Sequence, residues 1–196
     1  GLGDLKGAIA DYDQAIVLRP DVASAYHDRG LARYAQGELG AAIDDYDRAL
    51  ALNPDYAIAC YNRGLARYDR GEAELAIADF DQAIAEGFED AAVLNSRGLA
   101  HYAQGKLEAA IDDYDQAIGL KPEYGPAYRN RGLARQAQGD LEGVIADCDR
   151  AIDLGPHDPG AYNNRGLARH DAGDLSGAIA DYDQAIARFD RDVDRA

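Results

Sequence analysis

The chain has 196 residues, of which 47% are apolar, and it contains six prolines and no tryptophan. This composition is typical of a soluble helical protein and excludes a disordered chain, which would contain fewer Ile, Leu and Tyr residues. The formal net charge of −16 argues against non-specific binding to nucleic acid or to an anionic membrane, because both depend on a basic surface.

Three sequence features recur along the chain, and all three keep the same constant interval. One is the tripeptide Arg-Gly-Leu, which begins at Arg29, Arg63, Arg97, Arg131 and Arg165. Another is Asp-Tyr-Asp or a close variant, which begins at Asp11, Asp45, Asp79, Asp113, Asp147 and Asp181. The third is a glycine where a helix should stop and the chain reverse, at Gly3, Gly37, Gly71, Gly105, Gly139 and Gly173. A fixed period of this length predicts a repeat protein in which each unit is one helical hairpin.

In chain order, residues 1–22 predict half a repeat, with one helix over residues 5–18. The first complete repeat, residues 23–56, predicts helix A over residues 25–36 and helix B over residues 39–52, with Pro54 ending helix B. Four further repeats follow at residues 57–90, 91–124, 125–158 and 159–192, before a tail of residues 193–196. We therefore expect a single array of helical hairpins.

These residues resemble the tetratricopeptide repeat (TPR) family over nearly the whole chain, and the unit of that family is about 34 residues long. The small residues of that family, where helix A crosses helix B, correspond to Gly30, Ala42 and Ala49 in the first complete repeat. Its helix B aromatic residue corresponds to Tyr46, Phe80, Tyr114 and Tyr182. The resemblance implies an all-α fold, an α-solenoid in which antiparallel helix pairs stack into a right-handed superhelix. It also implies a scaffold that binds other proteins.

Two departures from the repeat pattern predict local differences in packing. In the fourth complete repeat, the helix B alanine is Val144 and the aromatic residue is Cys148. A larger residue beside a smaller one should roughly preserve the packed volume. Phe88 stands where other repeats end in proline, so the joint near Gly87 is expected to set a different angle.

The recurrent aspartates do not predict a catalytic or calcium site. Two residues that are two positions apart on a helix point in nearly opposite directions, so the aspartates of one Asp-Tyr-Asp cannot share a ligand. A calcium loop would need a glycine and a glutamate at fixed positions outside a helix. We instead expect salt bridges to the arginines of helix A, such as Arg29 and Arg33.

The remaining chemistry-bearing residues also predict no enzyme, metal site or cofactor. The histidines, at positions 27, 101, 157 and 170, have no metal-ligand spacing. Cys60 and Cys148 occupy positions held by tyrosine in sibling repeats, which predicts buried packing residues rather than nucleophiles. No nucleophile elbow, zinc-protease motif or phosphate-binding glycine loop is present in the sequence.

One row of helix A residues, spaced at i, i+4 and i+7, is not explained by packing within the hairpin and is the candidate binding surface. We call this row the stripe. In the five complete repeats it consists of His27, Leu31, Tyr34; Tyr61, Leu65, Tyr68; Asn95, Leu99, Tyr102; Arg129, Leu133, Gln136; and Asn163, Leu167, His170. In the TPR family this stripe lines the concave groove in which peptides or helices bind. An alternative is that the next repeat's helix A partly covers the leucines, which would make the groove narrower and more polar.

The leading hypothesis is therefore a scaffold that binds a basic or neutral peptide or protein segment in this groove. Two alternatives remain: self-assembly through the terminal repeats, as a dimer or filament, and a regulatory domain of a larger multidomain protein. The sequence shows neither a signal peptide nor a membrane span, and its two cysteines do not require an oxidising compartment, so we expect a cytoplasmic protein. Its first residue is Gly1, which suggests a fragment or a processed chain and leaves open a lost leader.

Overall fold

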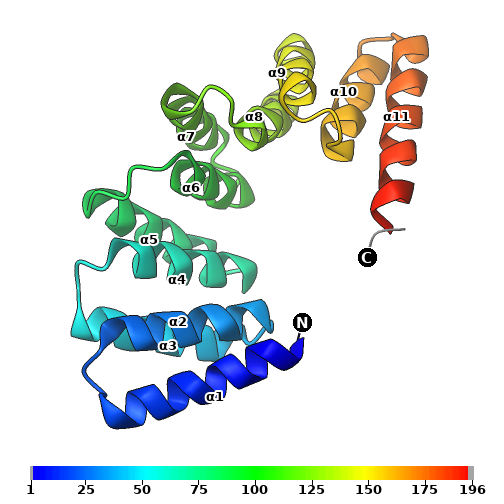
Figure 1. Ribbon diagram of the computed structural model, residues 1–196. Coiled ribbons are helices and arrows are strands. Elements are labelled where there is room, and N and C mark those ends of the chain that lie inside the picture. Colours follow the sequence, from blue (N-terminus) through cyan, green and yellow to red (C-terminus); the bar gives the residue numbers. More distant parts are fainter. Residues whose placement is uncertain (1, 194–196) are drawn as a thin grey trace. The chain divides into compact units, whose positions relative to one another are not determined.

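The structure is a computed structural model that describes residues 2–193, and every regular element in this range is an α-helix (Figure 1). The helices are α1 (Leu2–Leu18), α2 (Ala23–Ala35), α3 (Leu39–Leu52), α4 (Ala57–Asp69), α5 (Ala73–Ala85), α6 (Ala91–Ala103), α7 (Leu107–Leu120), α8 (Gly125–Gln138), α9 (Leu141–Leu154), α10 (Pro159–Asp171) and α11 (Leu175–Val193). They form two compact units, Gly1–Glu89 with α1 to α5 and Asp90–Ala196 with α6 to α11.

Within each unit the helices pack in chain order, each against the one before it and the one after it. The even-numbered helices are the predicted A helices, and the odd-numbered ones are the B helices. Helix A of one repeat also packs on helix A of the next, as α2 does on α4 and α8 on α10. The predicted all-α architecture of adjacent helix pairs is confirmed.

The turn inside each hairpin depends on a left-handed glycine. Gly37, Gly71, Gly105, Gly139 and Gly173 have φ values between 72° and 86°, a region that side chains disfavour. At the first of these turns the amide of Gly37 donates to the carbonyl of Tyr34, and that of Glu38 donates to Arg33, both at 2.9 Å. These bonds satisfy the last carbonyls of helix A and reverse the chain.

The prediction that the chain reverses at Gly3 is wrong. Helix α1 begins at Leu2 and not at residue 5, so Gly3 lies in its first turn. Glycine permits the left-handed conformation but does not require it, and here the helix passes through the residue.

A second set of glycines allows the two helices of a hairpin to cross closely. A Cβ atom at Gly30 would lie 2.7 Å from Cε1 of Tyr46, and one at Gly98 would lie 2.6 Å from Cε1 of Tyr114. Both tyrosine rings are fully buried, so neither has free space into which to move. The small and aromatic positions implied by the family resemblance therefore meet in the structure.

The fourth complete repeat packs differently at this crossing. Val144 and Cys148 are fully buried and share a cluster with Ala168, as expected for a larger residue beside a smaller one. The combination of Val144 and Cys148 nevertheless leaves space beside Gly132. A Cβ atom at Gly132 would lie 3.6 Å from the sulfur of Cys148, which is an ordinary van der Waals distance.

The chain also leaves α5 in a different way from the other B helices. Gly87 has a φ of 84°, and the amide of Phe88 donates to the carbonyl of Ala83 at 3.0 Å. Helices α3 and α7 instead end on residues with negative φ, Asn53 at −141° and Lys121 at −139°. The left-handed Gly87 therefore ends α5, whereas a proline follows each of the other B helices from α1 to α9.

Candidate binding surfaces on the A helices

The fifteen residues predicted to line a groove all lie on the A helices. Six are in the first unit, on α2 and α4, and nine are in the second unit, on α6, α8 and α10. On each helix the three residues share one face, because their spacing follows the helical repeat. We name these two sets the first and second helix A surfaces, one in each unit.

The first position of the stripe is not uniformly available to a ligand. His27 and Asn95 are buried. The side chain of Asn62 on α4 lies 2.9 Å from Nε2 of His27, and Asn130 on α8 donates to Asn95 at 2.8 Å. These two residues therefore join neighbouring A helices within their own units.

The other first-position residues are half-buried or exposed. Tyr61 is half-buried, and its ring lies 5.2 Å from that of Phe88. Arg129 is half-buried and forms an ion pair at 3.0 Å with Asp158, the residue that caps α10. Asn163 is exposed. Aromatic packing fixes Tyr61, whereas Asn163 is free to meet a ligand.

The leucines in the middle of the stripe are partly covered. Leu31 is 39% exposed and Leu167 is 40% exposed, whereas Leu65, Leu99 and Leu133 are half-buried. The leucines are thus neither fully exposed, as in a wide open groove, nor fully buried. Each surface therefore keeps leucine side chains that are partly open to solvent.

The third position is a tyrosine in the first three complete repeats. The hydroxyl of Tyr34 donates to Asp69, which ties α2 to α4. Burial, followed by this contact with Asp69, raises the pKa of Tyr34 to about 12. Tyr68 is half-buried, and Tyr102 packs against the buried cluster of Ala110 and Tyr114. In the later repeats Gln136 is half-buried and His170 is exposed.

Sequence reasoning missed one residue of the first helix A surface. Ile58 on α4 is exposed, and it lies three positions before Tyr61 and seven before Leu65. Residues at these spacings lie on the same helix face. The same spacing rule that selected Tyr61 would have found Ile58 if the stripe had been extended by one turn toward the start of the helix.

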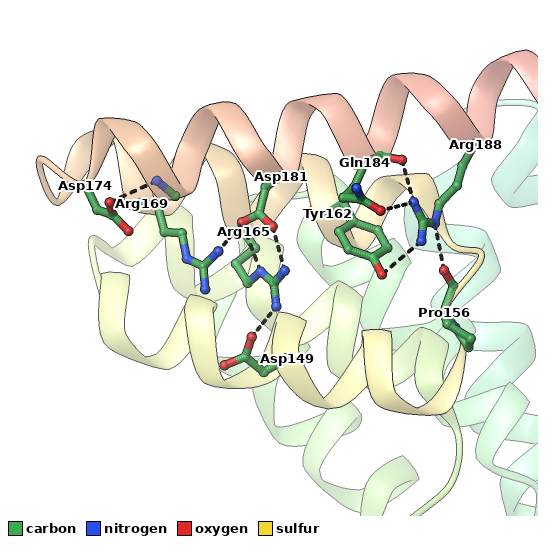
Figure 2. Close-up of polar contacts among 10 residues, drawn as sticks. Asp149, Pro156, Tyr162, Arg165, Arg169, Asp174, Asp181, Gln184 and Arg188 are labelled. Carbon is green, nitrogen blue, oxygen red and sulfur yellow. Dashed lines mark hydrogen bonds and ion pairs between the residues drawn. The ribbon is translucent and has the colours of Figure 1, made fainter.

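The recurrent aspartates of the B helices form ion pairs with arginines of the A helices, as predicted. In Figure 2, Arg165 bonds to Asp181 of its own hairpin and to Asp149 of the preceding hairpin, while Arg169 also bonds to Asp181. The hydrogen bonds to Asp181 are the largest cause of a raised pKa for Arg165. The same double pairing joins Arg29 to Asp45 and Asp13. We name this set of contacts the arginine–aspartate ladder.

Two further members of the ladder follow the same scheme, and one repeat modifies it. Arg63 pairs with Asp79 and Asp47, and Arg131 pairs with Asp147 and Asp115. In the third complete repeat Nδ1 of His101 takes the place of the second arginine and lies 3.0 Å from Asp113. These carboxylates are therefore structural partners and not free acids or bases.

The cysteines are packing residues, as predicted. Cys60 and Cys148 are free thiols and are fully buried. Burial raises the pKa of the Cys148 thiol to about 12. Among the side chains that the structure describes, no cluster of three or more His, Cys, Asp or Glu residues is arranged to hold a metal ion. Across the same described part of the chain, no helix has the length and apolar character needed to span a bilayer.

We expect neither cysteine to react with a thiol reagent such as Ellman's reagent at pH 8 while the chain is folded. Both thiols should react once guanidinium unfolds it, because only the exposed thiolate is nucleophilic. The Cys148 thiol ionises from about pH 9 in the unfolded chain but near pH 12 when folded. Its contribution to stability is therefore complete below pH 9 and is lost as the pH rises toward 12. Rapid labelling of the native chain would contradict the assignment.

The repeated hairpins, the close glycine–aromatic crossings and the helix A surfaces define a helical-repeat protein of the kind that scaffolds interactions between proteins. Two family models of tetratricopeptide repeats match the chain. One, a TPR repeat model, matches residues 2–37, 30–71 and 98–139, and the other, a tetratricopeptide repeat model, matches residues 125–193. The chain belongs to the tetratricopeptide repeat family. No curated protein sequence matches it.

Solved structures of other TPR proteins share this fold at low sequence identity. PilW, a widely conserved type IV pilus biogenesis factor, is similar with a TM-score of 0.86 and 18% identity, over 95% of this chain and 87% of PilW. YrrB, a TPR protein with an unusual peptide-binding site, has a TM-score of 0.72 and 21% identity, over 90% of this chain and 91% of YrrB. MamA has a TM-score of 0.75 and 24% identity, over 84% of this chain and 96% of MamA.

Proposed function

We propose that this TPR scaffold binds a peptide or protein segment through its helix A surfaces. The observation that carries the proposal is the row of partly exposed leucines and tyrosines on the A helices. Leu31, Leu65 and Tyr68 lie in the first unit, and Leu99 and Leu167 lie in the second. The recurrent Arg-Gly-Leu arginines of the A helices pair with aspartates in the arginine–aspartate ladder, so the apolar side chains are the more available groups for a partner.

The chemistry of these surfaces indicates the kind of partner that fits them. A ligand would cover the leucines with apolar side chains and would meet polar groups at Asn163, Gln136 and His170 in the second unit. The net charge of −16 attracts a basic segment more strongly than an acidic one. A basic or neutral segment with regularly spaced apolar residues is the best match.

One structural relative supports this proposal without deciding it. YrrB is a TPR protein with a peptide-binding site. At 21% identity to this chain, the similarity supports a shared fold and does not indicate which ligand this chain binds.

We expect a partner captured from a lysate of the source organism to depend on the helix A surfaces. A Tyr68→Ala, Tyr102→Ala variant should lose a protein that the unchanged chain retains, because the variant removes two aromatic contacts. A Leu75→Ala variant should retain it, because Leu75 is an exposed apolar residue on a B helix, α5. Mass spectrometry would identify the retained proteins, and circular dichroism would confirm that all three chains are folded.

Retention of the same proteins by the wild-type chain and the double variant would contradict the proposal. Recovery of further copies of the bait alone would instead favour the second candidate function, self-assembly. The observation behind that second candidate is on α1, where Val17 and Leu18 are strongly exposed apolar residues.

A further inference from the structure

One aspartate beside the first helix A surface has a neutral partner in place of a cation. Asp69, the last residue of α4, is exposed, and among the described side chains only the hydroxyl of Tyr34 on α2 bonds to it. The neighbouring Arg70 pairs with Glu72 at 2.6 Å instead. A phenol donates a hydrogen bond but carries no charge, so the negative charge of Asp69 is left uncompensated.

The repeat architecture does not require a carboxylate at this position. Three other complete repeats have alanine there, at Ala35, Ala103 and Ala137. The fifth complete repeat has Asp171, which lies 3.2 Å from Nδ1 of its neighbour His170. Asp69 is therefore a feature of the first unit alone in combining a carboxylate with a tyrosine from the preceding A helix.

Two further tyrosines lie close to this pair. Burial and then the charge of Asp69 raise the pKa of Tyr68, the preceding residue on α4. Burial, followed by contacts with Asp69 and Tyr61, raises the pKa of Tyr34, which places all three tyrosines within range of one another's electrostatic fields or that of the carboxylate. The ring of Tyr61 packs against that of Phe88, with 5.2 Å between centroids. The free chain thus already holds a carboxylate bordered by half-buried tyrosines.

We propose that Asp69 binds the ammonium group of a lysine side chain in the partner segment, with the rings of Tyr34, Tyr61 and Tyr68 beside it. The faces of aromatic rings attract cations, and a phenol oxygen can accept a hydrogen bond while its proton is donated elsewhere. The inference rests on the proposed function of the helix A surfaces and names one side chain of the segment that they bind.

The contact with Tyr34 favours lysine over arginine. Arginine typically holds a carboxylate with two parallel hydrogen bonds, one to each oxygen. Oδ2 of Asp69 already accepts the hydroxyl of Tyr34, so Oδ1 is the more available oxygen. An ammonium group is a compact point charge that needs only one of the two oxygens.

The test selects peptides from a random mixture. Nonapeptides displayed on phage are selected on the immobilised chain, and the retained sequences are read. They should combine apolar residues with one lysine. Selection on an Asp69→Asn variant should still retain apolar residues but should lose the preference for lysine. Asparagine keeps a side-chain oxygen for the Tyr34 hydroxyl, so the variant removes the charge and preserves the contact between α2 and α4.

Affinities of one selected peptide measure the effect. Fluorescence anisotropy should show about tenfold weaker binding to Asp69→Asn than to the unchanged chain, the scale of one lost charge-assisted hydrogen bond. The same peptide with norleucine in place of lysine should bind both chains equally, because it has no ammonium group. The matched control is Asp55→Asn, which removes the same charge from an exposed residue near the other end of α4 and should bind the lysine peptide unchanged.

The outcomes separate this site from the proposed function. Selection of apolar peptides without lysine, or equal binding of the lysine peptide by Asp69→Asn and the unchanged chain, would overturn the lysine site and retain the helix A surfaces. An equal loss in Asp55→Asn would indicate general charge attraction and would also overturn the site. An arginine form that binds as tightly as the lysine form would overturn the choice of lysine. Failure to select any peptide would overturn both proposals.

Discussion

Replacement of Asp181 by alanine is expected to lower the free energy of unfolding by about 3 kcal/mol, the low end of the range for breaking a buried ion pair. The Asp181 side chain is 3% exposed and accepts hydrogen bonds from Arg165 and Arg169 (Figure 2). Its loss leaves both guanidinium groups without their buried acceptor. The low end applies because Arg165 keeps its bond to Asp149.

The matched control is Asp149→Ala, which removes the other carboxylate from the same arginine. Asp149 is 51% exposed, and an exposed ion pair contributes about 0–1 kcal/mol. Urea denaturation followed by circular dichroism would measure both variants. Equal losses for Asp181→Ala and Asp149→Ala would show that burial of the carboxylate does not set the strength of the ladder.

Replacement of Gly98 by alanine should also destabilise the chain, whereas the same change at Gly132 should stabilise it. The new methyl group at Gly98 would overlap the buried ring of Tyr114, with 2.6 Å between carbon atoms, and overpacking costs about 1–3 kcal/mol. At Gly132 the nearest atom is 3.6 Å away. There the helix gains about 0.5–1 kcal/mol, because alanine loses less backbone entropy than glycine.

The same denaturation experiment compares these two variants, which make the same chemical change at equivalent repeat positions. A Gly98→Ala chain with an unchanged or higher urea midpoint would show that the Tyr114 ring can move aside. A Gly132→Ala chain with a lower midpoint would show that the space beside Cys148 is already needed by the native packing.

Features that depend on contacts within a hairpin were predictable from the sequence. The turn at Gly37, the crossing of Gly30 and Tyr46, and the pairing of Arg29 with Asp45 all follow from a single repeat. Each needs only helical periodicity and the size or charge of the residues concerned, and the constant period of the repeats presents the same information again along the chain.

Features that depend on contacts between repeats were harder to predict. His27 and Asn95 share a stripe with exposed residues, yet each is buried by a polar contact with a residue 35 positions later. The helical spacing of α2 or α6 alone contains no information on that contact. The openness of Asn163, by contrast with the buried Asn95, likewise depends on which side chains the neighbouring helices bring to it.

The arginine–aspartate ladder gives each unit a polarity along its stack of hairpins. Arg165 reaches back to Asp149, and Arg63 reaches back to Asp47, so each of these arginines also serves the hairpin before its own. Separation of two hairpins therefore leaves unlike surfaces. The earlier hairpin keeps an uncompensated carboxylate, whereas the later one keeps an arginine that is still held by its own buried aspartate. In such an acidic chain the earlier hairpin then carries one more unpaired negative charge, at a cost of only about 0–1 kcal/mol because the aspartate is exposed.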